Sequence, residues 1–411
     1  MVRKFKNHKY PILIGGLCVS FFLLFLVSCT KNDYTQIEDP AYLRVFNSLN
    51  YNITIETMDY NYPYLCMIVN PKFDETGMPI AGEIIGDNLD KRNIYAPPYP
   101  THVGNSTTVH NPEYPGKENV LVGPILNGFD LSSWAQIPSG KKRFLFMFRP
   151  KNSTPFFELD DKLKRMVLLD TTLELKSKEV YTMNILQKDF GKKKYDVILR
   201  QENFHKQAFS DSLVYVNFYN YSSNGFFQAP ASLKNITSAM GLLKDGIKDD
   251  LNIFLSLYEG HDDIDRSQVY RNYRGVYLGN VKRNLDNSNP TEYYNFPMRA
   301  DTSANGIYTK TWQRFEFLLP GMDISSHPQS FLTINGQNDG NYFSVNCIRN
   351  GKVEVGPSAH YSNGIILPSL LINIHSGEFN PKTFATVNTM EIINNFLYLT
   401  TIQRKYPAPK Y

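Results

Sequence analysis

The stretch Tyr42–Asn47, with the sequence YLRVFN, decides the fold because nearly the same pattern returns at Tyr215–Asn220 as YVNFYN. Both stretches read tyrosine, aliphatic, polar, apolar, aromatic and asparagine. Alternating apolar and polar residues are typical of a strand with one buried face, and a closing asparagine favours a turn. The two openings therefore predict two copies of one strand-rich domain.

A second pair of motifs follows in the same order. Val180–Ile185 (VYTMNI) precedes an apparent strand at Tyr195–Arg200, and Val387–Ile392 (VNTMEI) precedes one at Phe396–Ile402. The spacing between the first and second motifs differs in the two copies, so their loops must differ in length.

The two tryptophans of the chain give a third, looser match. Trp134 and Trp312 each precede a Pro/Gly turn and lie near an apolar strand, Arg143–Phe148 or Arg314–Leu319. Three matches in the same order predict a tandem duplication.

Short strands separated by turns rich in Pro, Gly and Asn favour an all-β fold over long helices. The pattern predicts two tandem immunoglobulin-like antiparallel β-sandwich domains, residues 41–205 and 212–406. One or two helical turns are expected at Asp160–Met166, and a helix at Ser232–Leu243. The strands expected in the first domain are Tyr42–Leu49, Ile53–Met58, Leu65–Asn70, Arg143–Phe148, Thr171–Leu175, Val180–Gln187 and Tyr195–Arg200. Those expected in the second include Leu213–Tyr219, Asn252–Leu257, Gly275–Leu278, Arg314–Leu319, Asn341–Ile348 and Ile365–Ile374, before the two closing segments.

These motifs resemble a repeated all-β family of unknown function that is common in secreted proteins and lipoproteins. Its opening strand reads Tyr-Val-Arg-Val-x-Asn, followed by a Pro-x-Gly turn and a Gly-x-x-Tyr-Thr strand. Tyr42–Asn47, Ile137–Gly140 and Val180–Thr182 match in that order, whereas Asn217 and Asn388 depart from it. The resemblance implies a fold and no activity, since the family offers no catalytic residues to transfer.

The N-terminus predicts an exported lipoprotein. A basic start and the apolar run Pro11–Val27 lead to Leu26–Cys29 (LVSC), which resembles the lipobox cut by signal peptidase before its cysteine. The run is shorter than the ~20 apolar residues of a spanning helix. We expect a signal peptide at 1–28, lipid (palmitate among its acyl chains) on Cys29, and a polar tether over 29–40. In the lipoproteins that this start resembles, an aspartate after the cysteine favours retention in the inner membrane. Thr30 at this position therefore favours the outer membrane, with the domains facing the periplasm or the cell surface.

Charge argues against a nucleic-acid partner. The formal net charge of the whole sequence is +4, and the expected signal peptide carries four basic and no acidic residues. The mature chain is then formally neutral, whereas nucleic-acid binding requires an excess of basic residues on one face of the protein.

The cysteines indicate neither zinc nor a disulfide framework. The chain has four: Cys18 leaves with the signal peptide and Cys29 is lipidated, so Cys66 and Cys347 remain. Each lies in an apparent strand, where a buried cysteine acts as a small hydrophobe. We expect two separate buried thiols, although an exported chain could pair them.

No catalytic motif is present, so we expect no enzyme activity, no cofactor and no metal. The acidic stretch Glu259–Asp265 (EGHDDID) is the densest candidate for calcium, but it lacks the closing carboxylate of a calcium loop, and a solvated loop is favoured. The carboxylates within Glu158–Asp161 would serve glycoside hydrolysis only if they faced a cleft.

Aromatic loops offer the best candidate for a ligand site. Tyrosines stand beside Asn, Pro and Arg, and such rings bind the apolar faces of sugars while their hydroxyls bind polar groups. The alternative is that the rings close the ends of the sandwiches or form a protein interface. The long segment Asp74–Glu118 is expected to be a surface loop that carries specificity. The candidate residues are Tyr60, Tyr62, Tyr95, Tyr99, Tyr270 and Tyr273.

Together these patterns predict a non-catalytic, surface-anchored lipoprotein that acts as a binding or scaffold module. One alternative is a glycan-binding accessory lipoprotein of a polysaccharide-uptake system. Another is an adhesin or fimbria-type structural subunit, which an open sheet edge would favour. The expected partners are the membrane, through the lipid, and a glycan or a protein.

Overall fold

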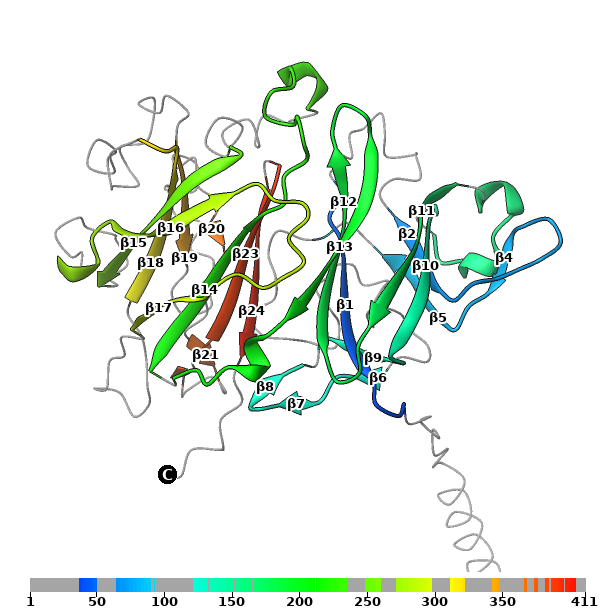
Figure 1. Cartoon of the computed structure of the whole chain (residues 1–411), viewed down its shortest axis with the longest axis horizontal. Helices are drawn as coiled ribbons and strands as arrows, with labels where there is room; N and C mark the ends of the chain where they lie inside the picture. Colours follow the sequence, from blue (N-terminus) through cyan, green and yellow to red (C-terminus); the bar gives the residue numbers. More distant parts are fainter. Residues whose placement is uncertain are drawn as a thin grey trace, which may run out of the picture. The chain divides into compact units, whose positions relative to one another are not determined.

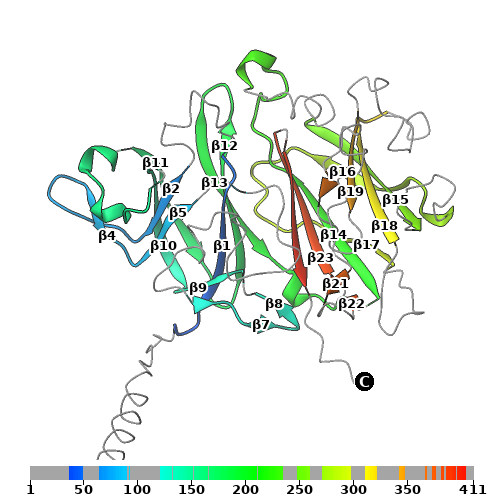
Figure 2. The same cartoon turned by 180° about the vertical axis from the view of Figure 1, so that it is seen from behind.

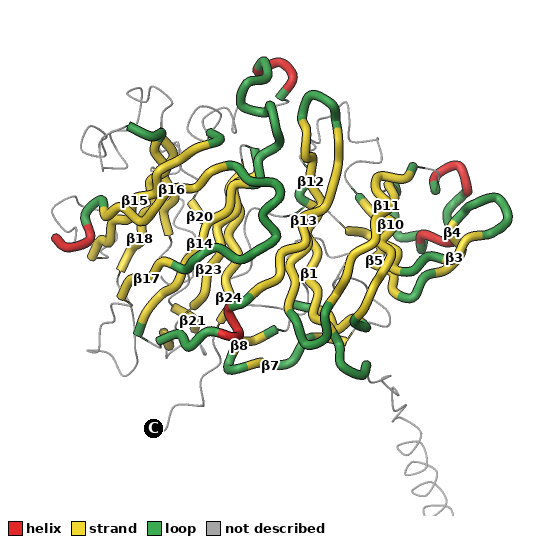
Figure 3. Tube along the Cα trace, viewed as in Figure 1, coloured by secondary structure: helices red, strands yellow, loops and turns green. Residues whose placement is uncertain are grey.

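A computed structural model describes residues 37–49, 64–89, 92, 121–131, 133–150, 152–164, 166–210, 212–234, 248–259, 271–297, 311–321, 342–347, 366–367, 373–375, 381–383, 386–394 and 396–403. The chain divides into Met1–Gln36, which lies outside these ranges, and Ile37–Tyr411. Throughout the described part the regular structure is strand, interrupted only by one-turn 3-10 helices (Figure 3). The predicted all-β fold is confirmed.

The first half of Ile37–Tyr411 holds two facing sheets (Figure 1). One has the order β13 (Lys194–Glu202), β12 (Val180–Asp189), β1 (Ala41–Asn47), β9 (Ala135–Ile137) and β6 (Leu121–Val122). The other has the order β11 (Val167–Leu175), β10 (Gly140–Phe148), β2 (Leu65–Val69) and β5 (Ile84–Leu89). The first core lies between these two sheets, where Leu43 and Val45 of the first sheet pack with Met67 and Phe144 of the second.

The second half repeats this arrangement. One sheet has the order β17 (Tyr294–Pro297), β14 (Leu213–Asn220), β23 (Thr386–Ile393) and β24 (Phe396–Gln403). Its partner has the order β16 (Val276–Lys282), β15 (Asp250–Glu259), β18 (Thr311–Leu318), β19 (Tyr342–Cys347) and β20 (Ile366–Leu367). Two-stranded ribbons complete the strands: β3 (Lys72–Phe73) with β4 (Pro79–Ala81), β7 (Ile125–Leu126) with β8 (Phe129–Asp130), and β21 (Asn373–His375) with β22 (Pro381–Thr383).

Apart from the additional edge strands β6 and β20, the strands of the two halves follow the same order in their sheets. In this correspondence β1 is equivalent to β14, and β12 is equivalent to β23. Each opening strand pairs in parallel with the later strand, placing Tyr42 opposite Val180 and Tyr215 opposite Val387. This differs from the purely antiparallel prediction. Parallel neighbours need a long crossover, and the remaining strands of each half supply it.

The predicted tryptophan match is wrong, although the strands beside it correspond. Trp134 directly precedes β9, whereas Trp312 lies within β18. The residue of the second half that precedes the strand equivalent to β9 is Tyr293. Arg143–Phe148 and Arg314–Leu319 do fall in equivalent strands, β10 and β18.

Both faces of the opening strands are buried, which the alternation alone did not predict. Leu43 and Val45 point into the first core, while Tyr42 joins a cluster that also contains Tyr215 and Val387 of the second half. The sheet of β1 therefore packs against the sheet of β14, in addition to its own sandwich partner (Figure 2).

Several local expectations need correction. The segment Asp74–Glu118 is not wholly loop, because Pro79–Ala81 and Ile84–Leu89 are strands and Ile84 and Leu89 enter the first core. The one or two helical turns expected at Asp160–Met166 are, by contrast, confirmed as one 3-10 turn, η2 (Asp161–Leu163). The helix expected at Ser232–Leu243 overlaps η4 (Ala231–Leu233), and its remainder lies largely outside the described residues.

The expected strand Ile53–Met58 also lies outside the described residues. Cys66 is a buried free thiol in β2, as predicted. Cys347 lies in β19, and nothing is described of its side chain.

Candidate functional site

Of the residues proposed from sequence, Tyr273 alone falls in the described part of the chain. It belongs to η6 (Arg271–Tyr273) and is half-buried against the second core. The others, Cys29, Tyr60, Tyr62, Tyr95, Tyr99 and Tyr270, lie outside the described residues.

The carboxylates within Glu158–Asp161 are exposed and serve local turns. Asp160 accepts a hydrogen bond from the backbone N–H of Lys162 at 2.9 Å, and Asp161 lies 2.9 Å from Lys164 Nζ. Across the described ranges, no group of three or more His, Cys, Asp or Glu side chains could hold a metal ion.

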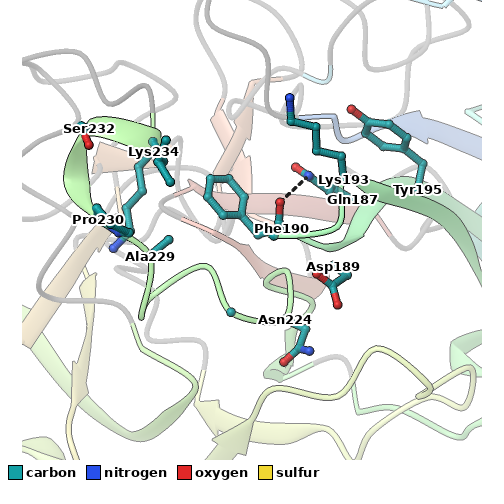
Figure 4. Close-up of a pocket in the computed structure, with 13 residues that line it drawn as sticks. Gln187, Asp189, Phe190, Lys193, Tyr195, Asn224, Ala229, Pro230, Ser232 and Lys234 are labelled. Carbon is teal, nitrogen blue, oxygen red and sulfur yellow. Dashed lines mark hydrogen bonds between the residues drawn. The ribbon is translucent and has the colours of Figure 1, made fainter.

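A groove of about 780 Å³ lies where the β12–β13 hairpin of the first half meets the segment that follows β14 of the second (Figure 4). We call it the seam groove. It is lined by Gln187, Asp189, Phe190, Gly191, Lys193, Tyr195, Asn224, Gly225, Ala229, Pro230, Ser232, Leu233 and Lys234.

Backbone hydrogen bonds join the two walls of the seam groove. The N–H of Phe190 donates to the carbonyl of Asn224 at 3.0 Å, and the N–H of Asn224 donates to the carbonyl of Lys188 at 2.9 Å. Ser223 Oγ donates to the carbonyl of Gln187 at 2.6 Å. Gly225 follows with a φ of +77°, a conformation that glycine adopts without strain, so the chain can turn sharply into the second wall.

Phe190, which lines the groove, packs on aromatic rings that lie outside the groove lining. Phe190 meets Phe226 edge to face at 5.1 Å, and Phe226 meets Phe227 at 5.3 Å. Lys234 Nζ lies 5.2 Å from the centre of the Phe226 ring and donates to the carbonyl of Phe227 at 3.1 Å. On the opposite wall Tyr195 is half-buried and packs on the first core.

The charged groups of the groove leave an excess of ammonium. Asp189 Oδ1 accepts the N–H of Lys192 at 2.9 Å, and this hydrogen bond is the main reason that the pKa of Asp189 lies below its usual range. Asp189 is therefore ionised, and its charge offsets one of the two lysines in the groove lining, Lys193 and Lys234. Lys193 is exposed and has no carboxylate within ion-pair distance in the described part of the chain. Lys188 is already paired with Asp286 at 2.7 Å.

A buried ion network lies between the two halves and beneath the groove-forming hairpin. Glu391 of β23 contacts Arg92 at 2.5 Å and Arg200 at 2.7 Å, and the side chains are at most 1% exposed. Asn184 Nδ2 donates to the same carboxylate at 2.9 Å. Burial alone would raise the pKa of Glu391, but the two guanidinium groups lower it to about 2.

Arg92 was missed at the sequence level because it lies inside the predicted loop Asp74–Glu118. Its backbone N–H donates to the carbonyl of Asn47 at 2.7 Å, and its guanidinium lies 3.8 Å from the centre of the Phe46 ring. The sequence signal that could have revealed this ion pair lies in its other member, Glu391. Glu391 interrupts the otherwise uncharged strand VNTMEII, and such a carboxylate, once buried, requires a partner.

Apolar clusters flank this network on both sides. One combines Trp134 and Phe204 of the first half with Val387 and Ile402 of the second. The other combines Ile198 with Tyr398 and further residues of both halves. The seam groove therefore has walls whose relative positions are fixed by a continuous buried interface.

A second cavity of about 440 Å³ lies in the second half beneath the segment Asn284–Tyr294. Two of its tyrosine hydroxyls are already engaged. Tyr219 OH accepts the N–H of Thr291 at 2.8 Å, and Tyr221 OH donates to the carbonyl of Asn287 at 3.2 Å. These two hydroxyl groups therefore bind the segment that covers the cavity.

No protein-family model matches this chain. No curated protein matches it either. Among solved structures, a proposed cell adhesion protein from Parabacteroides distasonis ATCC 8503 aligns over 91% of this chain and 99% of its own, at 10% identity and a TM-score of 0.17. A second proposed cell adhesion protein, from Bacteroides ovatus ATCC 8483, aligns over 92% and 100%, at 8% identity and a TM-score of 0.14. TM-scores this low carry no argument about fold or function.

In the part of the chain that the structure describes, no helix has the length and apolar character needed to span a bilayer.

Proposed function

We propose that this chain is a non-catalytic binding module of the cell surface, anchored in the outer membrane by lipid on Cys29, and that the seam groove holds its ligand. The observation that carries the proposal is a groove of about 780 Å³ whose two walls come from different sandwiches that share a buried interface. Fixed walls reduce the ordering cost of binding.

The lining favours binding over chemistry. It combines ring surfaces with amide, hydroxyl and ammonium groups, the mixture that orients a polar ligand. The lining contains neither His nor Cys, and its one carboxylate, Asp189, is held by backbone N–H groups. A general acid or base needs a group that is free to exchange a proton with the substrate.

A glycan is the ligand that we propose first, which makes the chain an accessory of polysaccharide uptake. Ring faces such as Phe190 suit the apolar faces of sugars, and Gln187 and Ser232 suit hydroxyl groups. The test is a glycan-array screen of the full-length protein in mild detergent. The exposed Ser232 lines the groove, so Ser232→Trp should obstruct it and abolish binding, whereas Ser177→Trp, at an exposed turn outside the groove lining, should not.

Two results contradict this proposal in different ways. Hits that Ser232→Trp leaves unchanged would place the glycan site elsewhere on the chain. An empty array would remove the glycan proposal and favour a protein partner.

An adhesin or structural subunit is the second candidate, and the edge strand β11 favours it. Among the described strands β11 pairs only with β10, and Val167 at its start is 53% exposed. An open edge can accept a strand from another protein. Cross-linking of intact cells would support this candidate if Thr172→Pro, which removes a backbone donor on this strand, lowered the yield of a specific adduct without unfolding the protein.

The anchor is tested separately. Cys29→Ala should abolish labelling by radioactive palmitate and release the protein from the membrane fraction. If the variant is labelled and sediments like the native protein, the lipid-anchor proposal is wrong.

A further inference from the structure

We infer that the ligand of the seam groove is an acidic glycan, one whose sugar units carry carboxylate or sulfate groups. This inference rests on the proposed function and adds the chemical class of the ligand. The first support is charge. Lys193 and Lys234 line opposite walls of the groove, and Asp189 is the single carboxylate of the lining, so ammonium groups are in excess there (Figure 4).

The neighbouring residues strengthen the positive field. Lys192, Lys193 and Lys194 are consecutive and exposed at the tip of the hairpin. Lys192 lies 4.0 Å from Asp189, and the other two have no carboxylate at that distance among the described residues. A wall with an excess of one charge raises the local concentration of ligands of the opposite charge.

The second support is that backbone groups are already paired where the hairpin turn meets the opposite wall of the groove. The N–H groups of Phe190, Asn224 and Lys193 donate to carbonyl groups at 3.0, 2.9 and 3.4 Å. The N–H of Lys192 donates to Asp189. An extended peptide bound by strand addition needs unpaired backbone groups, so this part of the groove is better suited to a ligand that is bound by side chains.

The third support is the pairing of rings with ammonium groups. Phe190 and Tyr195 project from the hairpin wall, while Ser232 and Lys234 come from the opposite wall (Figure 4). A sugar unit can place its ring face on an aromatic group while its carboxylate or sulfate accepts hydrogen bonds from an ammonium, and charge-assisted bonds of this kind are the stronger ones.

The test compares matched ligands by calorimetry with the full-length protein in mild detergent. One pair is an oligogalacturonate and its carboxyl-reduced neutral counterpart. The other pair is a sulfated galactan oligosaccharide and its desulfated form. We expect each acidic ligand to bind about tenfold more tightly than its neutral partner, with a difference that shrinks as salt is added. The tighter of the two acidic ligands identifies the anion.

Variants assign the effect to the groove. Lys193→Gln should weaken acidic binding about threefold and Lys193→Glu more strongly, because Lys193 is exposed and partly screened. Lys234→Gln should weaken it about tenfold, provided that its melting temperature is unchanged. Lys192→Gln is the matched control on the same turn but outside the groove lining, and its effect should be smaller than that of Lys193→Gln.

Each outcome decides between the inference and its premise. If neutral and acidic glycans bind equally and Ser232→Trp abolishes both, the groove binds glycans but the charge inference is wrong. If no glycan binds, the proposed function fails and the inference with it. If an oligoglutamate peptide binds more tightly than any of the sugars, the ligand class is wrong and an acidic protein segment takes its place.

Discussion

Replacing Glu391 by Gln should destabilise the whole of the described fold, because this carboxylate neutralises two buried guanidinium groups. Arg92 would lose its counter-charge, and Arg200 would keep only Glu202, at 2.8 Å. Removing one partner of a buried ion pair costs about 3–5 kcal/mol. A domain of ordinary stability has about 5–15 kcal/mol in total, so the loss is large.

The pKa of Glu391 leads to a similar magnitude. In the folded protein it lies at about 2, compared with an ordinary value of 4.5. That shift corresponds to roughly 3 kcal/mol of stabilisation. Because the folded pKa is the lower one, this stabilisation is complete above about pH 4.5 and is lost as the pH falls towards 2. Glu391→Gln should therefore lose less stability than the native protein over that range.

Urea unfolding at neutral pH and at pH 3, followed by circular dichroism and tryptophan fluorescence, measures both effects. Asp170→Asn is the control, because its ion pair with Arg143 at 2.6 Å is exposed and should be worth at most about 1 kcal/mol. If Glu391→Gln costs no more than this control, the buried network does not hold the two halves together. A separate unfolding transition for each half would refute the shared interface as a source of cooperativity.

Three further predictions concern single residues. Gly225→Ala should cost about 1–2 kcal/mol in urea unfolding, because φ is +77° there and no atom lies within 4 Å to add a clash; a cost near zero would contradict the backbone argument. Trp134→Phe should cost about 1–3 kcal/mol, because the indole N–H donates to the carbonyl of buried Tyr181 at 3.1 Å and the Arg44 guanidinium lies 3.8 Å from the ring centre; an unchanged denaturation midpoint would show that neither contact matters. Cys66 should resist iodoacetamide in the native protein at pH 8 and react in urea, because burial raises the pKa of its thiol; mass spectrometry of the alkylated peptide measures this, and rapid native labelling would contradict it.

Much of the architecture follows from short-range pattern. The alternation of YLRVFN and YVNFYN predicted strands at Tyr42–Leu49 and Leu213–Tyr219, which the structure has at Ala41–Asn47 and Leu213–Asn220. The motifs VYTMNI and VNTMEI fall in the strands that pair with them. A period of two places alternate side chains on opposite faces wherever the strand lies in the molecule. The same local signal did not identify equivalent tryptophans, because Trp134 precedes β9, whereas Trp312 lies within β18.

The candidate site was beyond the reach of such patterns. Lys193 and Lys234 looked like ordinary surface lysines, and no motif joins the hairpin of one half to the segment after β14 of the other. The aromatic residues proposed from sequence are, with the exception of Tyr273, outside the described residues, so their role stays a prediction.

Period-two alternation was thus sufficient for the opening strands of the two halves, the all-β class and the repeated order of motifs, because each depends on neighbours within a few residues. The burial of Arg44, Arg92 and Glu391 depended on the packing of one sandwich on the other. Arg92 and Glu391 are 299 residues apart, and only the tertiary fold brings them into contact. On the outer face of an isolated sandwich a polar side chain faces water, but here the same face packs against the sheet of the other half. Whether such a side chain is solvated or must form a buried ion pair therefore depends on the interface and not on the local sequence.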